Sequence, residues 1–144
     1  MRPRAWLRGR SVVGDVLVNE AFLDGDVPRL GAVCYESALE VGLSGDRALR
    51  FAVAIVQALN QAIQRGGPAR VLSVLHDNGG QLIAEISDGC DGIELARPTA
   101  SREPMINGGL SLTRQLVDEM TVRPGQFGIT LRLVMTVGAR DRET

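Results

Sequence analysis

Hydrophobic residues recur along the chain at two spacings, and these predict its strands and helices. Residues 16–23 alternate apolar with polar side chains, a pattern typical of a strand, and the Asp-Gly-Asp sequence at 24–26 interrupts it. Pro28 suits the first turn of a helix, and Gly42 marks its end. Between them the apolar residues return at helical spacing: Leu30, Val33, Cys34, Ala38 and Val41.

A second helix is predicted over residues 45–65. Ser44 is a favoured N-cap residue, and the Gly-Gly-Pro sequence at 66–68 ends the helix. Its apolar stripe is predicted to consist of Leu49, Val53, Val56 and Ile63.

The rest of the chain is predicted to be mainly β structure. Residues 71–75 and 82–87 form a hairpin, because the Asp-Asn-Gly-Gly sequence at 77–80 tolerates positive φ. The remaining elements follow in order: an irregular stretch to Asn107, a helix from Gly108–Gly109 to Met120, a strand from Val122, a turn at Pro124–Gly125, and a last strand over 129–137.

This order of elements predicts an α+β two-layer sandwich, in which a mostly antiparallel mixed sheet carries its helices on one face. The predicted domain covers residues 15–138. A basic tail at 1–14 precedes it, and a tail at 139–144 follows it. The stretch at 93–107 has the length of loops that often serve as functional lids.

Composition narrows the chemistry available to this domain. All 16 basic residues of the 144 are arginine, which excludes a P-loop lysine and a Schiff-base lysine. His76 is the only histidine, and Cys34 and Cys90 form no Cys-x-x-Cys pair, so a zinc ribbon is not expected. The absence of a disulfide framework fits a reducing, intracellular setting. A net charge of −1 and the lack of a long apolar run predict neither nucleic-acid nor membrane binding.

An uncharged polar line runs along the second predicted helix. It consists of Gln57, Asn60, Gln61 and Gln64, whose spacing of i, i+3, i+4 and i+7 places them on one side. A line of amides favours a polar, partly shielded surface, and an ordinary solvated helix face is the alternative.

Two glycine-containing segments lie downstream. Asp88 ends a predicted strand and is followed by Gly89 and Gly92, so the backbone there could approach a ligand closely; a plain turn is the alternative. Asn107 and Gly108–Gly109 open the third predicted helix, where free N–H groups could face an anion such as phosphate; an ordinary N-cap is the alternative.

Taken together, these segments resemble the histidine kinase/Hsp90-like ATPase superfamily, and most of all the bacterial anti-sigma-factor serine kinases. The resemblance covers residues 16–137. The sequence FAVAIVQALNQAIQRG resembles the N-box helix of that family, and EISDGCDGIELARP resembles its Asp-x-Gly-x-Gly segment. NGGLSLTRQLVDEM with TVRPGQFGITLRLV resembles its second glycine box, closing helix and last strands. The resemblance implies a Bergerat-type ATPase fold and a cytoplasmic protein.

The same resemblance implies roles for individual residues. Asp88 is at the position that reads adenine, Gly92 and Gly109 are retained glycines, and Asn107, Gly108 and Thr130 belong to the same nucleotide site. The general base is usually a glutamate, but that position is Gln57, and an amide cannot accept a proton at neutral pH.

The N-box helix also differs from the family pattern at the position expected to bind magnesium. The usual magnesium ligand is an asparagine, but that position is Gln61. Asn60 is adjacent, but one residue turns a helix by about 100°, so Asn60 cannot simply replace the expected asparagine. Any positive charge on the phosphates would have to come from arginine, and Arg65 and Arg102 are candidates by position only. The sequence therefore predicts weak or absent binding of ATP or ADP, with magnesium doubtful.

Three functions follow from this resemblance. The first is a regulatory protein that binds a sigma factor or an anti-sigma antagonist and whose kinase activity is lost or weak. The second is an active ATP-dependent serine kinase of the anti-sigma class. The third is a dimeric scaffold without nucleotide that uses the first predicted helix, with Leu30, Val33 and Val41, as its interface. A homodimer is expected, since kinases of this family are often dimers.

Overall fold

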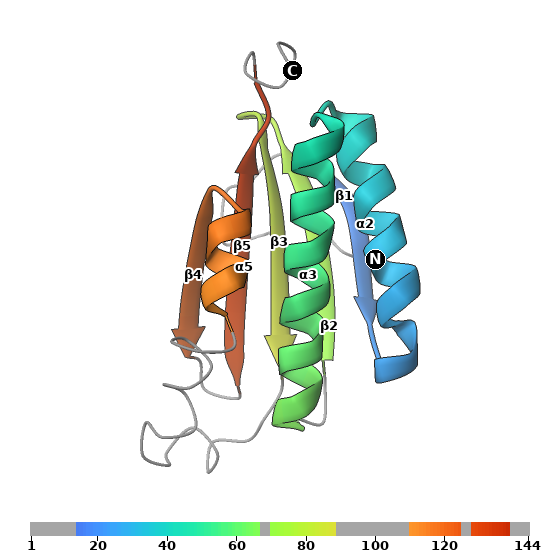
Figure 1. Cartoon of the computed structure of the whole chain (residues 1–144), viewed down its shortest axis with the longest axis vertical. Helices are drawn as coiled ribbons and strands as arrows, with labels where there is room; N and C mark the ends of the chain where they lie inside the picture. Colours follow the sequence, from blue (N-terminus) through green and yellow to red (C-terminus); the bar gives the residue numbers. More distant parts are fainter. Residues whose placement is uncertain (1–13, 67–69, 89–109, 125–127, 139–144) are drawn as a thin grey trace.

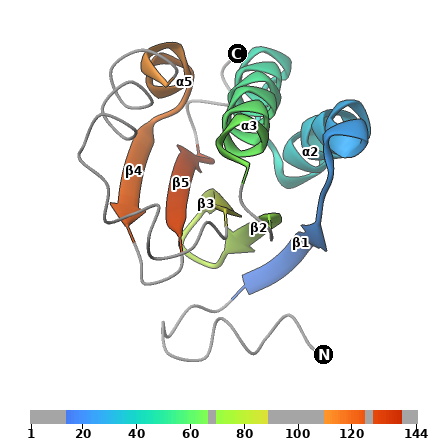
Figure 2. The ribbon, with the colours of Figure 1, turned by 90° about the horizontal axis from the view of Figure 1, so that it is seen from below.

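The computed structural model has one sheet covered on one face by helices, which confirms the predicted α+β two-layer sandwich (Figures 1 and 2). It describes residues 14–66, 70–88, 110–124 and 128–138. The elements in chain order are β1 (Gly14–Ala21), η2 (Asp24–Asp26), α2 (Val27–Val41), α3 (Gly45–Arg65), β2 (Arg70–Asp77), β3 (Gln81–Asp88), α5 (Ser111–Leu116), β4 (Glu119–Pro124) and β5 (Ile129–Thr136).

The five strands lie in the order β1-β2-β3-β5-β4. Each of the four pairings between described strands is antiparallel, so the parallel component of the expected mixed sheet is not found among them. The last strand in sequence, β5, inserts between β3 and β4, and it pairs Ile129 with Asp88. The carboxyl end of β3 therefore lies inside the sheet rather than at an edge.

The predicted boundaries of α2 agree with the structure. Pro28 lies in its first turn, and Gly42 ends it with a φ of 113°. Leu30, Cys34 and Ala38 are fully buried, while Val33 and Val41 pack partly buried against the same core. These apolar residues therefore contribute to the core of this chain, Leu30 fully and Val33 and Val41 in part.

The helix α3 has the predicted bounds but buries a different face. The Ser44 hydroxyl accepts from the Arg47 N–H at 3.2 Å, and Gly66 ends the helix with a φ of 79°. The predicted stripe is wrong in its first half, because Leu49 is 55% exposed and Val53 is 38% exposed. The buried face consists instead of Ala48, Phe51, Ala52, Ala54, Ile55, Ala58, Leu59 and Ala62. Five of these buried residues are alanines, whose small side chains let α3 pack closely.

The hairpin between β2 and β3 forms as predicted. The Asp77 side chain accepts from the N–H groups of Gly79 at 3.0 Å and Gln81 at 2.9 Å, and Gly80 has a φ of 85°.

The third predicted helix is shorter than expected. The helix α5 ends at Leu116, and Val117 is already extended, so Met120 lies in β4 and not on a helix. The Asp118 N–H donates to the Val134 carbonyl, and its carboxylate accepts from the Thr136 N–H at 2.7 Å. These two bonds to β5 draw the chain into the sheet and end the helix.

Candidate functional site

Asp88 forms a buried ion pair with Arg65. Asp88 is the last residue of β3 and Arg65 the last residue of α3, so two rigid elements hold the two side chains. The Arg65 Nε donates to Asp88 Oδ2 at 2.7 Å. The side chains are only 11% and 4% exposed. The carboxylate that the resemblance assigns to adenine therefore already accepts a charge-assisted hydrogen bond from the chain itself.

A small cavity adjoins this pair. Its volume is about 20 Å³, and its walls are Ala58, Gln61, Ala62, Arg65, Ile86, Asp88, Leu110, Ile129 and Leu131. A cavity of this size holds about one water molecule, far less than the roughly 300 Å³ of a small ligand pocket. Among the described residues, the space beside Asp88 is therefore about the size of one water molecule.

Gln57, at the expected position of the general base, has a structural contact. The Thr113 hydroxyl on α5 donates to Gln57 Oε1 at 2.8 Å, and Thr113 is fully buried. The hydrogen bond joins α3 to α5. The amide thus accepts from a neighbouring helix, and it satisfies a hydroxyl that has no access to water.

The amide line on α3 is divided by the structure. Gln57 and Gln61 are half-buried, and Gln61 lines the cavity beside Asp88. Asn60 and Gln64 are exposed. The line is therefore partly shielded on the α5 side and solvated elsewhere, and Asn60 does not share a cavity with Asp88.

Thr130 lies apart from this cluster. Its neighbours Ile129 and Leu131 line the cavity, and alternate residues of a strand point to opposite faces, so Thr130 faces the helix-free side of the sheet. Its hydroxyl is 3.4 Å from that of Ser87. Of the other predicted site residues, Gly92, Asn107, Gly108 and Gly109 lie outside the described residues, as does Arg102.

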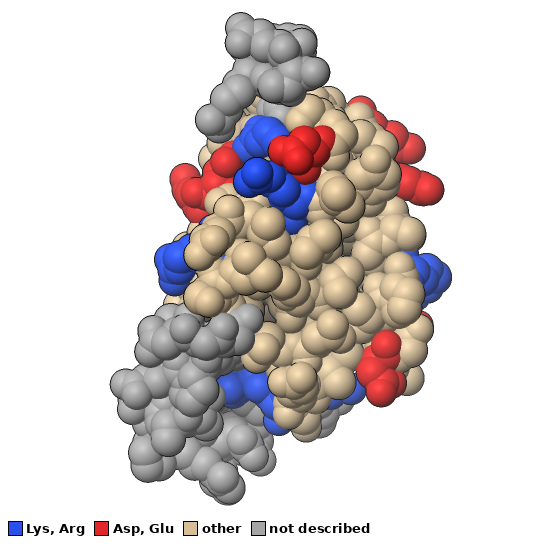
Figure 3. Space-filling view, in the orientation of Figure 1, with Lys and Arg blue, Asp and Glu red and all other residues tan. Residues whose placement is uncertain are grey.

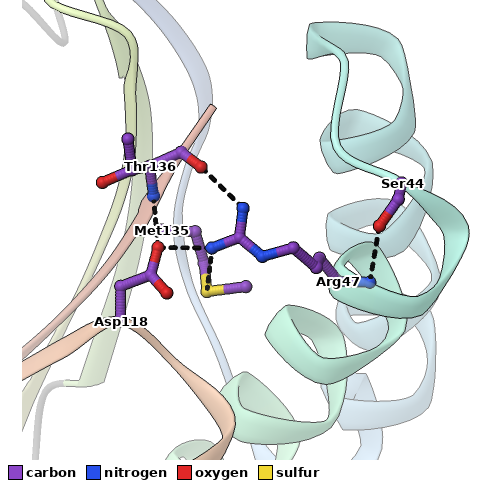
Figure 4. A network of polar contacts seen from close by, with 5 residues as sticks. All are labelled: Ser44, Arg47, Asp118, Met135 and Thr136. Carbon is purple, nitrogen blue, oxygen red and sulfur yellow. Dashed lines mark hydrogen bonds and ion pairs between the residues drawn. The ribbon is translucent and has the colours of Figure 1, made fainter. Parts of the chain in front are cut away.

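A second polar cluster at the other end of α3 was not predicted (Figure 4). The Arg47 guanidinium forms an ion pair with Asp118 and donates to the Thr136 carbonyl at 2.7 Å. It adjoins a cavity of about 300 Å³ between α3 and α5, whose walls include Arg50, Leu116 and Met135. Arg47 and Asp118 are 71 residues apart, so no local pattern could identify them as partners.

The described part of the chain contains no group of three His, Cys, Asp or Glu side chains able to hold a metal ion. Nor does any described helix have the length and apolar character needed to cross a membrane. No protein-family model matches the chain, and no curated protein matches it.

Proposed function

We propose that this protein is a regulatory domain that binds a sigma factor or an anti-sigma antagonist and has lost phosphoryl transfer. The observation that carries the proposal is the hydrogen bond from Thr113 to Gln57. At the position where the resembling kinases place a glutamate base, this chain has an amide that cannot take a proton and that joins two helices.

Two features of the described residues favour loss of ATP and magnesium binding. The Asp88 carboxylate is paired with Arg65, and the cavity beside it has about 20 Å³. Phosphoryl transfer depends mainly on positioning and electrostatics, so an active kinase stays the alternative. An amide at position 57 and a paired Asp88 nevertheless favour a function that depends on protein contacts.

The helix layer offers a surface suited to such contacts. Leu49 and Val53 on α3 and Leu112 on α5 are 55%, 38% and 50% exposed. Figure 3 shows that the middle of this face is free of charged side chains, which lie around its edges. An exposed apolar area bordered by charge is typical of a protein-binding surface.

The proposal is tested by incubating the purified chain with magnesium-ATP and a purified anti-sigma antagonist, and following serine phosphorylation by mass spectrometry. We expect no phosphorylation above that of a protein-free control. A parallel thermal-shift titration with ATP and ADP, with and without magnesium, should leave Tm unchanged, since a ligand at 100 times its Kd adds about 2.7 kcal/mol of stability. Phosphorylation at ordinary kinase rates would overturn the proposal.

Binding is measured separately by calorimetry against the purified sigma factor and antagonist. Leu49→Asp and Val53→Asp should weaken the binding at least tenfold without lowering Tm, because both side chains are exposed. Leu23→Asp is the matched control, since Leu23 is 66% exposed and lies outside α3 and α5, which carry the apolar area of Leu49, Val53 and Leu112. If neither protein binds the wild-type chain, the proposed partners are wrong.

A further inference from the structure

We propose that the cavity at the start of α3 binds a small carboxylate with an apolar body. The carboxylate pairs with the Arg50 guanidinium, and the apolar body lies against Leu116 and Met135, which line the same cavity. The inference concerns the opposite end of α3 from Asp88, and it does not depend on the proposed function.

This cavity has the size of a site for a small organic molecule. Its volume is about 300 Å³, at the lower end of the roughly 300–1,000 Å³ of small-ligand pockets. The cavity beside Asp88 has only about 20 Å³. The walls of the larger cavity come from α3, α5, the residues between α5 and β4, and β5. Several elements of the fold therefore shape it together.

The inner wall of this cavity is apolar and is held in place by the core. Met135 on β5 is 1% exposed and belongs to the hydrophobic core. Leu116 and Val117 are half-buried and pack against the same core. Because apolar surface gains free energy when it leaves water, a ligand with an apolar body is favoured along this wall.

The charged pair nearest the core is already compensated. Arg47 and Asp118 form an ion pair, and their side chains are 13% and 29% exposed. Figure 4 shows both at the Thr136 backbone, where Arg47 donates to the carbonyl at 2.7 Å and Asp118 accepts from the N–H at 2.7 Å. Since each charge has its counter-charge and a fixed hydrogen bond, this pair forms a wall of the cavity and does not select the charge of a ligand.

The outer charged pair is Arg50 with Asp46, and a ligand can exchange with it. The Arg50 Nε donates to Asp46 Oδ2 at 3.1 Å, and the two side chains are 50% and 76% exposed. Exposed pairs of this kind contribute little stability, so a ligand can displace Asp46. A guanidinium also binds a carboxylate through two parallel N–H···O bonds, which gives the ligand a stronger contact than a single bond from Nε.

Two features favour an anion over a cation at this cavity. The long side chain of Arg50 can follow a ligand, whereas Asp46 is short and stays largely hydrated. The cavity also lies at the N-terminal end of the 21-residue helix α3, where the helix dipole favours negative charge. Figure 3 shows basic side chains gathered near this end of the helix layer. The ligand class is therefore an apolar monocarboxylate.

The test is calorimetric titration of the full chain with compounds of one shape and different charge: 3-phenylpropanoate, 3-phenylpropan-1-ol and 3-phenylpropylamine. We expect 3-phenylpropanoate to bind with a Kd on the order of 1 mM or below. The alcohol and the amine should bind at least about tenfold more weakly, because neither forms a charge-assisted hydrogen bond with a guanidinium.

Substitutions at the outer pair test the role of Arg50. Arg50→Met keeps an apolar stem and removes the charge, so it should weaken binding of 3-phenylpropanoate at least about tenfold. Its Tm should stay unchanged, because Arg50 is half exposed. Arg29→Met is the matched control on α2, at an arginine that is 55% exposed and paired with Glu20, and it should leave the affinity unchanged. Asp46→Asn removes the competing carboxylate and should bind at least as tightly as the wild-type chain.

The place of binding is found by NMR of the chain labelled with ¹³C at its methionine methyl groups. 3-Phenylpropanoate should shift the Met135 signal and leave that of Met120, on β4, in place.

Equal binding of the alcohol or the amine would overturn the assignment to an anion. Absence of binding, an unmoved Met135 signal, or binding that Arg50→Met does not weaken would overturn the site itself. None of these outcomes bears on serine phosphorylation or on binding of a sigma factor, so this proposal and the proposed function fail separately.

Discussion

At the scale of single residues, burial decides which groups can react. Cys34 is fully buried among the core side chains of α2. Burial raises the pKa of its thiol to about 12, because a thiolate in the core would lose its hydrating water. The Cys34 thiol therefore keeps its proton at physiological pH, where it fills the core and is not a nucleophile.

The raised pKa of Cys34 predicts a fall in stability at alkaline pH. An unfolded thiol ionises near pH 8.5, while the folded one keeps its proton until about pH 12, so raising the pH between these values favours the unfolded chain. The free energy of unfolding should fall by about 1.4 kcal/mol per pH unit more than that of Cys34→Ala above pH 9. Denaturant melts of both chains at several pH values measure the difference, and parallel curves would contradict it.

Gln57 provides a second residue-scale prediction. Gln57→Ala leaves the Thr113 hydroxyl buried without this acceptor and should lower the free energy of unfolding by about 1–3 kcal/mol. Gln57→Glu keeps an acceptor oxygen and should cost less than Gln57→Ala. Asn60→Ala is the matched control on the same helix, since Asn60 is exposed and should change stability by less than about 0.5 kcal/mol. Urea melts provide the comparison, and equal losses for Gln57→Ala and Asn60→Ala would refute the structural role.

At the scale of elements, α3 is held at each end by an arginine that reaches another element. At its start, Arg47 forms an ion pair with Asp118, just before β4 (Figure 4). Both side chains also bind the Thr136 backbone: Arg47 donates to its carbonyl, and Asp118 accepts from its N–H. At its end, Arg65 contacts Asp88 on β3. The alanine-rich middle lies against the sheet.

Removing the first of these contacts should loosen the junction between α5 and β4. Asp118→Ala removes the acceptor of both Arg47 and the Thr136 N–H, so we expect a loss of about 2 kcal/mol. Hydrogen exchange at the Thr136 amide should become faster than in the wild-type chain. Asp46→Ala is the control, because its pair with Arg50 is exposed and such pairs contribute about 0–1 kcal/mol. Unchanged exchange at Thr136 would show that Asp118 does not hold the strand.

At the scale of the whole molecule, the two arginine contacts lie at opposite ends of one helix. Arg47 and Arg65 are separated by about 27 Å along α3, at about 1.5 Å per residue, and they pair with different carboxylates, Asp118 and Asp88. Substitutions at such distances usually add. Arg47→Ala and Arg65→Ala should therefore combine within about 0.5 kcal/mol of the sum of the single losses.

A double-mutant cycle from urea melts measures this additivity. A coupling energy well above about 0.5 kcal/mol would mean that α3 transmits strain between its ends. In that case the polar cluster at Arg47 and the site at Asp88 would form one cooperative unit.

Much of the fold could be predicted from local sequence. Ser44, Gly42 and Gly66 define helix ends because capping and left-handed backbone are properties of one residue and its neighbours. The turn at 77–80 follows from its own composition in the same way. The length of α5 could not be predicted in this way, because hydrogen bonds from Asp118 to β5 end that helix.

The sequence by itself determined the α+β order of elements, the helix caps, and the line of amides along α3 that includes Gln57 and Gln61. Tertiary structure alone decided which face of α3 is buried, because small alanines rather than Leu49 and Val53 fit against the sheet. It also decided the partners of Gln57 and Asp88, since a side chain finds its hydrogen-bonding partner only after distant elements pack. That is why Arg65, 23 residues from Asp88 in sequence, emerged as its partner only in the folded chain.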